Sequence, residues 1–181
     1  MNVAKLTEEQ LKTAFSHEML LRGEGSVGQF YDCTVKNGDL HGNIKGNHGV
    51  YNVTLYTSGA PVKGECNCKS AAYEPCKHAA ALGLSYIYTP WVFKSEDKID
   101  RSNLKSIDDI QFYVAITPLR QFVDELKAKN ISLSKLAEIS RIPLQQISTA
   151  VRDSENGTPH TLTDVLKLAS LYLLDNSSLK A

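Results

Sequence analysis

The sequence predicts an α+β fold in two parts, a small antiparallel β-meander with flanking helices and then an all-α bundle. Two observations lead to this prediction. Between residues 29 and 56 apolar and polar side chains alternate with a period of two, which is the spacing of half-buried strands. From Pro118 onward the apolar residues instead recur at helical spacing.

Length and composition fit two small domains. The chain has 181 residues, of which 42% are hydrophobic and 22% charged, as in ordinary globular proteins. Residues 94–109 are highly charged and mostly polar, the composition of a linker. We therefore expect one domain over 1–90, a linker over 91–116 and a second domain over 117–181.

The N-terminal segment predicts an amphipathic helix over residues 4–21, in which Thr7 can cap the N-terminus. Asn37-Gly38 is a strong signal for a two-residue hairpin turn between strands. A fourth short strand, around Val62 to Cys66, should follow the meander. The three strands of the meander are expected at 29–35, 40–46 and 50–56.

Charge is balanced along the chain, with 20 basic and 20 acidic residues. Residues 1–90 carry eight of each sign and residues 91–181 twelve of each, so neither half is strongly basic as a non-specific nucleic-acid binder would be. The first twenty-odd residues lack an apolar signal core, and no apolar run is long enough to span a membrane. We expect an intracellular protein in the cytoplasm, nucleoid-associated if it binds DNA, and no membrane partner.

Three of the four cysteines cluster with a histidine. Cys66-x-Cys68 is followed by seven residues and then by Cys76-x-His78. Three thiolates and one imidazole form a complete tetrahedral ligand set for one Zn²⁺, and they leave no coordination position open for catalysis. The pattern thus predicts a single structural zinc ion, although thiolates do not decisively exclude iron. Cys33 stands apart and is interpreted as a small buried hydrophobe.

The predicted structure explains how the ligands meet. Cys66 and Cys68 should lie on a strand end that curls, because residues i and i+2 of a regular strand stand nearly 7 Å apart. Cys76 and His78 should begin a helix that continues over 79–88, since backbone N–H groups at a helix N-terminus favour thiolate. The alternatives are an accidental grouping or a redox-active Cys66–Cys68 pair.

This order of strand, Cys-x-Cys, loop, Cys-x-His and helix resembles the SWIM-type zinc finger. The resemblance covers about residues 20–90 and includes the glycine-punctuated strands upstream of the cysteines. Domains of this type are associated with both DNA and protein interaction, so the resemblance implies a zinc-bearing interaction module.

The C-terminal part predicts a series of short helices separated by clear boundaries. Asn130 can adopt the left-handed conformation that ends a helix, and Ser132 can cap the next one. A turn at Arg141-Ile142-Pro143 precedes the third helix. The expected helices run from Leu119 to about residue 129, over 133–140, over 144–152 and over about 162–174.

The order and spacing of these helices resemble a lambda-repressor-like helix-turn-helix domain. The resemblance implies that residues 144–152 form a recognition helix on double-stranded DNA. Arg141 occupies a turn position where the family usually has glycine, which costs about 1 kcal/mol if its φ is positive. The residues expected to contact DNA are Lys135, Arg141, Gln145, Gln146, Ser148, Thr149 and Arg152.

Two functions remain open from the sequence. The leading hypothesis is a zinc-containing DNA-binding protein, a transcriptional regulator or an accessory factor of a mobile element. The alternative is a protein-interaction adaptor or an inhibitor of a nucleic-acid enzyme, which the neutral charge favours. Homodimerisation is left open, because Leu168, Leu171, Tyr172 and Leu174 would either pair two copies or fill the protomer's own core. No phosphate loop, paired-carboxylate motif or nucleophile triad indicates an enzyme.

Overall fold

The predicted α+β class is confirmed. The chain divides into two compact units, Met1–Ile116 and Thr117–Ala181. The first contains a five-stranded, mostly antiparallel sheet, and the elements of the second are helices. Among the described residues no helix has the length and apolarity needed to cross a bilayer. The computed structural model describes residues 6–72, 76–97, 101, 104–156, 158 and 160–176.

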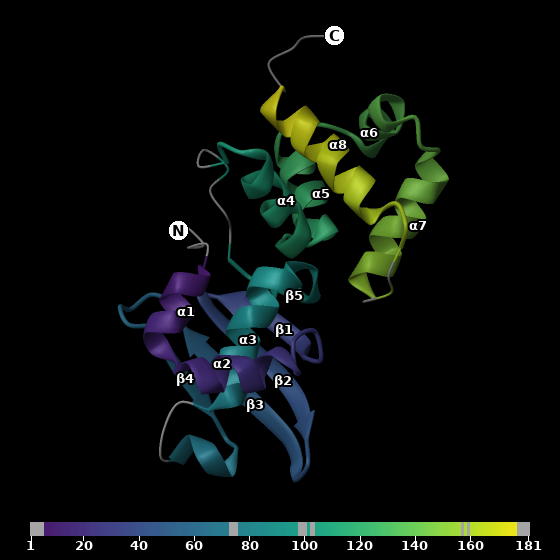
Figure 1. Ribbon diagram of the computed structural model, residues 1–181. Coiled ribbons are helices and arrows are strands. Elements are labelled where there is room, and N and C mark those ends of the chain that lie inside the picture. Colours follow the sequence, from purple (N-terminus) through teal and green to yellow (C-terminus); the bar gives the residue numbers. More distant parts are fainter. Residues whose placement is uncertain are drawn as a thin grey trace. The chain divides into compact units, whose positions relative to one another are not determined.

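The sheet of the first unit has the strand order β4-β3-β2-β1-β5 (Figure 1). Its four sequence-predicted strands pair antiparallel in a meander, as expected. The fifth strand, which the sequence did not predict, runs parallel to β1. The strands are β1 (Tyr31–Lys36), β2 (Asp39–Gly46), β3 (Gly49–Tyr56), β4 (Lys63–Cys66) and β5 (Phe93–Ser95).

The hairpin turn predicted at Asn37-Gly38 joins β1 to β2. Both residues have positive φ, 53° and 82°, which is the conformation of a type I′ turn. The carboxylate of Asp97 accepts a 2.8 Å hydrogen bond from each of their backbone N–H groups. A residue sixty positions away therefore holds the turn that sets the register of the sheet.

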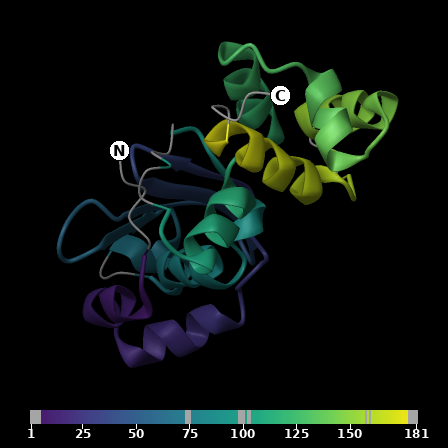
Figure 2. The same ribbon diagram turned by 90° about the horizontal axis from the view of Figure 1, so that it is seen from above.

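Helix α3 (Lys77–Tyr88) packs against one face of the sheet, and α1 (Glu8–Ala14) and α2 (His17–Glu24) pack against α3, so that these helices and the sheet build the core (Figure 2). Gly23 lies where two of these helices cross so closely that a Cβ on it would stand 3.0 Å from the backbone N of Ala81. The core side chains that these helices contribute are almost fully buried, for example Leu11 and Leu82.

The single helix predicted over 4–21 is two helices, α1 and α2; residues 4–5 lie outside the described residues. Thr7 caps α1 in a capping box with Gln10, which agrees with the predicted cap. Phe15 then adopts an extended conformation and Ser16 caps α2 by accepting from the backbone N–H of Met19. The break turns Phe15 into the core, where it is 4% exposed.

The linker predicted over 91–116 needs correction, because part of this segment belongs to the first unit. It contains β5 and helix α4 (Ile107–Ile116), and the 3₁₀ turn η2 (Pro90–Val92) reaches into it. Phe93 is 1% exposed and Tyr86 packs edge-on against it, so burial anchors this segment despite its charged composition. Part of the predicted linker, residues 98–100, 102 and 103, lies outside the described residues.

The second unit has the predicted helices. Ser132 caps α6 by accepting from the backbone N–H of Lys135, and Asn130 has a left-handed φ of 57° as expected. Its core contains large side chains such as Phe122 and Leu166, both fully buried. The helices are α5 (Leu119–Ala128), α6 (Leu133–Ser140), α7 (Leu144–Glu155) and α8 (Thr163–Asp175).

The four apolar residues of α8 that were considered for pairing two copies divide between the core and the surface. Leu171 and Leu174 are buried in the protomer, at 6% and 1% exposure. Leu168 and Tyr172 are 49% and 54% exposed and lie on the outer face of the helix. Half of the set therefore fills the core of the unit.

Candidate metal centre and nucleic-acid interface

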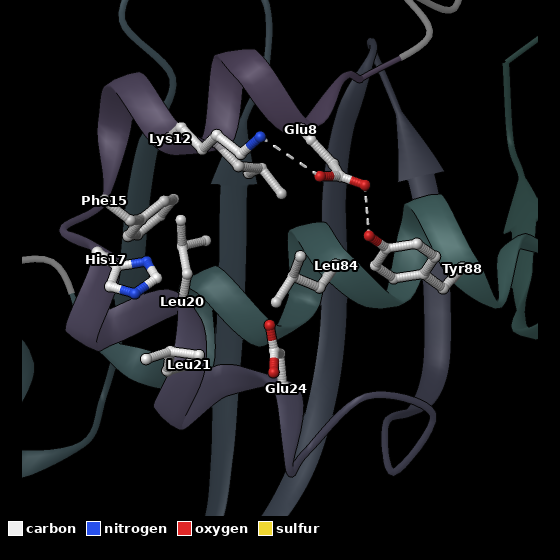
Figure 3. A pocket seen from close by; sticks show the side chains of 10 residues that line it. Glu8, Lys12, Phe15, His17, Leu20, Leu21, Glu24, Leu84 and Tyr88 are labelled. Carbon is white, nitrogen blue, oxygen red and sulfur yellow. Dashed lines mark hydrogen bonds and ion pairs between the residues drawn. The ribbon is translucent and has the colours of Figure 1, made fainter.

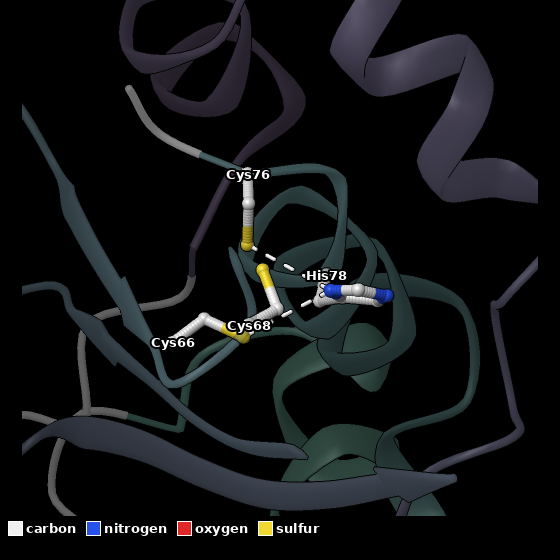
Figure 4. A group of neighbouring side chains, drawn as sticks. All are labelled: Cys66, Cys68, Cys76 and His78. Carbon is white, nitrogen blue, oxygen red and sulfur yellow. Dashed lines mark hydrogen bonds between the residues drawn. The ribbon is translucent and has the colours of Figure 1, made fainter. Parts of the chain in front are cut away.

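The four predicted metal ligands come together from the end of β4, the segment that follows it and the start of α3 (Figure 4). Cys66 is the last residue of β4, and Cys68 lies just before the 3₁₀ turn η1 (Lys69–Ala72). Cys76 is the N-cap of α3, and His78 is the second residue of that helix. The curled strand end and the helix start are those that the sequence predicted; residues 73–75 of the connecting loop lie outside the described residues.

The spacing of the ligand atoms fits a tetrahedral metal ion. All four atoms lie within 4.8 Å of one another. The Nδ1 atom of His78 is 3.8 Å from Cys66 Sγ and 3.9 Å from Cys76 Sγ. Around tetrahedral Zn²⁺, sulfur and nitrogen ligands stand about 3.6 Å apart and two sulfurs about 3.8 Å apart, given the usual bond lengths. The cluster can therefore hold one metal ion with little rearrangement.

Electrostatics at the N-terminus of α3 favour a thiolate at Cys76. A hydrogen bond from the Cys66 thiol, together with the backbone N–H groups of Ala79 and His78, lowers the pKa of Cys76. The pKa of Cys66 is raised in turn, because its proton is held in that hydrogen bond. Of the two thiols, that of Cys76 is therefore the more readily converted to the anionic form that a metal needs.

Side chains around the cluster hold the ligands in place. The ring of Tyr51 lies 4.9 Å from the imidazole of His78, centroid to centroid. Gly46 leaves room for that ring, since a Cβ there would stand 2.2 Å from a ring carbon of Tyr51. The sequence did not single out these contacts, because the two residues are distant from the histidine along the chain. Packing of the two rings restricts the orientations that the imidazole of His78 can adopt.

Cys33, by contrast, takes no part in the cluster. It is 2% exposed in the core, as predicted for a small buried hydrophobe. Burial raises the pKa of its thiol to about 12. Such a thiol is chemically inert in the folded protein.

In the second unit, α6 and α7 are joined by the tight turn that the sequence predicted. Arg141 closes α6 in the left-handed conformation, with φ 55° and ψ 26°. Helix α7 follows from Leu144 and buries Ile147 and Ala150 completely. The opposite side of α7 faces solvent.

The seven residues predicted to contact DNA differ in exposure. Arg141, Gln145, Gln146, Ser148 and Arg152 are exposed, whereas Lys135 and Thr149 are partly buried. On α7 the residues at positions 145, 148, 149 and 152 recur at the spacing of one helix face. This face offers amide, hydroxyl and guanidinium groups, which can all form hydrogen bonds with base edges or phosphates.

Acidic residues neutralise several of the cations near this face. Lys135 Nζ lies 2.9 Å from a carboxylate oxygen of Glu138, and Arg152 Nε lies 3.9 Å from Asp153. Arg120 pairs with both Asp124 and Glu155, the last residue of α7. The positive field of the unit is therefore modest.

None of the protein-family models, curated proteins or solved structures compared with this chain matches it. The two resemblances seen in the sequence therefore rest on this chain's own residues and geometry.

Proposed function

We propose that this chain is a zinc-containing DNA-binding protein that reads duplex DNA through α7. In this proposal it acts inside the cell, as a transcriptional regulator or an accessory factor of a mobile element, and not as an enzyme. The observation that carries the proposal is that α7 has one buried apolar side and one exposed polar side. Ile147 and Ala150 fix the helix to its unit, while the face with Gln145 and Arg152 is free to enter a major groove.

The proposed base contacts follow from side-chain chemistry. Gln145 is suited to the N6 and N7 edge of adenine, and Arg152 to the O6 and N7 edge of guanine. Arg141, at the turn, would lie near the phosphates. Because several cations are already paired, we expect a shallow dependence of affinity on salt concentration.

The first unit would serve as a SWIM-like zinc module. One Zn²⁺ held by Cys66, Cys68, Cys76 and His78 would have no open coordination position, so its role would be to fasten β4 to α3. Bound there, the metal supplies folding energy rather than reaction chemistry.

The test is selection of binding sites from a random-sequence duplex pool. We expect the zinc-loaded protein to enrich a defined sequence, and the variant Gln145→Ala/Arg152→Ala to lose that enrichment while keeping its zinc and helicity. A variant with the same residue types removed from the first unit, Gln29→Ala/Arg22→Ala, is the control and should enrich the same sequence. Palindromic enrichment would indicate two copies on one site. No enrichment at low salt would refute the sequence-reading role.

The second candidate function is a protein-interaction adaptor or inhibitor of a nucleic-acid enzyme. It is favoured by Ile139 and Leu144, two apolar side chains on either side of the turn that are 41% and 43% exposed. A failed duplex selection with a folded, zinc-loaded protein would support this function.

A further inference from the structure

A groove in the first unit lies between α1, α2 and α3, with a volume of about 370 Å³ (Figure 3). None of the residues that line it belongs to the cluster of three cysteines and one histidine, or to the face of α7 proposed to bind DNA. Its floor is made by the apolar side chains of Leu11, Phe15, Leu20 and Leu84. The volume is in the range of sites that bind drug-sized ligands or a few side chains of a partner.

The groove is open along one side. Leu11, Phe15 and Leu84 are 0%, 4% and 6% exposed, so the floor is a continuation of the core. At the rim, Leu21 and Tyr88 are 52% and 50% exposed. An occupant would cover apolar surface with one side and keep its other side in water, and therefore should be amphipathic.

The rim has an acidic end. Glu8 accepts a hydrogen bond from the hydroxyl of Tyr88, and Glu24 lies near enough to that hydroxyl to help raise its pKa. Glu24 has no hydrogen-bond or ion-pair partner for its carboxylate among the residues described. Lys12, the one lysine at the rim, is already 3.0 Å from Glu9 and 3.6 Å from Glu8. His17 lies toward the opposite end of the groove (Figure 3).

Two carboxylates beside an exposed phenol ring suit an ammonium or guanidinium group, through charge attraction and cation–π contact. A second copy of this chain does not offer that chemistry through α8, because Lys167, the one cation of that helix, is buried. The exposed apolar face of α8 carries Val165, Leu168 and Tyr172, and Asp164 and Asp175 lie at its two ends.

We propose that this groove binds an amphipathic helix of a partner protein, with apolar side chains on the floor and a lysine or arginine between Glu8, Glu24 and Tyr88. A helix fits because its side chains at positions i, i+3 and i+4 reach one side together. The proposal is independent of DNA binding, because it uses neither α7 nor the metal ligands.

The probe is a fluorescent helical peptide of about 18 residues with leucines on one face and lysines on the other, and its counterpart carries glutamates in place of the lysines. Anisotropy titration of the full zinc-loaded chain should show at least about fivefold tighter binding of the lysine peptide. Equal binding of the two peptides, or none of either, would overturn the proposal.

Two matched variants locate the binding. Glu24→Lys and Glu18→Lys make the same charge change on the same helix, but Glu18 lies outside the groove, where it pairs with Arg22. We expect Glu24→Lys to weaken the lysine peptide about fivefold more than Glu18→Lys does. Leu21→Ser, at an exposed rim position, should weaken both peptides by about fivefold without unfolding the chain. Equal losses of peptide affinity for the two charge reversals, or no loss for Leu21→Ser, would show that the groove is not the binding site.

Discussion

Asn52 and Asn67 are joined by three hydrogen bonds that tie the Cys-x-Cys segment to the central part of the sheet. The backbone N–H of Asn52 donates to Asn67 Oδ1 at 2.9 Å, and Asn67 Nδ2 donates to Asn52 Oδ1 at 3.3 Å. The backbone N–H of Asn67 donates to the Asn52 carbonyl at 3.4 Å. Because Asn67 stands between Cys66 and Cys68, this link fixes the curl that aims both thiols at α3.

Asn67→Ala should weaken the metal site. The variant loses the two side-chain hydrogen bonds, and we expect about 1 kcal/mol of lost stability and about tenfold lower metal affinity. The measurement is the rate of zinc transfer to a chromogenic chelator. Asn43→Ala is the control, since it removes only the 2.7 Å bond from Asn52 Nδ2 to Asn43 Oδ1. Equal transfer rates for the two variants would show that the link does not support the metal.

The four thiols should separate into a group of three and a single one. With metal bound, none should react quickly with a disulfide reagent at about pH 8. After the metal is removed by a chelator, Cys66, Cys68 and Cys76 should react, whereas Cys33 should react only when the chain unfolds. With its pKa raised to about 12 by burial, only about one Cys33 side chain in ten thousand is thiolate at that pH.

Cys33→Ala is the control for this assay. It should bind the same amount of zinc and show the three reactive thiols without the slow fourth. A fourth fast thiol in the chelated wild-type chain would contradict the buried position of Cys33.

Arg141→Gly should stabilise the second unit by about 1 kcal/mol, because glycine adopts the left-handed conformation at no steric cost. Arg141 has φ 55°. If the guanidinium contacts phosphate, the same variant should also bind DNA more weakly. Its unfolding temperature should therefore rise while its affinity for duplex DNA falls. Arg152→Gly, within α7, is the contrast and should destabilise by about 1 kcal/mol through helix propensity. A lower unfolding temperature for Arg141→Gly would argue against the left-handed turn.

Asp97→Ala should loosen the hairpin that it holds from a distance. The variant removes both hydrogen bonds to the turn N–H groups, and we expect a loss of about 2 kcal/mol in the free energy of unfolding by urea titration. Glu96→Ala, at the neighbouring position, removes only an exposed 3.4 Å pair with Lys36 and should change stability by under about 0.5 kcal/mol. Similar effects of the two substitutions would mean that Asp97 does not hold the turn.

Lys167→Met should stabilise the second unit. Burial lowers the pKa of Lys167, and its ammonium is 3.8 Å from Asp164. Because burial disfavours the charged form of Lys167 more than the attraction to Asp164 favours it, replacing the ammonium by an apolar side chain of similar size should gain about 1 kcal/mol.

The pH dependence of this gain has a definite sign. The folded chain binds the Lys167 proton more weakly than the unfolded chain, so the wild type gains stability as pH rises from the lowered pKa toward the lysine value of about 10.4. The advantage of Lys167→Met should therefore shrink in that range. An advantage that is constant with pH would point to packing instead of charge.

Local patterns in the sequence predicted the elements with strong signals of their own. The Asn37-Gly38 turn, the cap at Ser132 and the left-handed Asn130 depend on neighbouring residues, so they could be read without knowledge of the fold. The four candidate metal ligands were predictable for a related reason. Their residue types and short spacing restrict the arrangements that can satisfy a tetrahedral ion.

Contacts between distant segments decided the rest. The break at Phe15 and the strand Phe93–Ser95 were missed because their signals are short or lie beside charged residues, and only burial in the core outweighs local preference. The register of the sheet likewise decides which side chains, such as Tyr51, lie beside the candidate metal ligands.

By itself, then, the sequence determined the α+β class, the four strands of the meander in their order, the helices of the second unit and the four candidate ligands, because each follows from local periodicity, capping or spacing. The tertiary structure alone decided that Asp97 holds the first hairpin and that Tyr51 packs on His78. It also decided that α1, α2 and α3 leave an acid-rimmed groove. The physical reason is that these contacts join residues far apart in the chain, whose free energy exists only once the core brings them together.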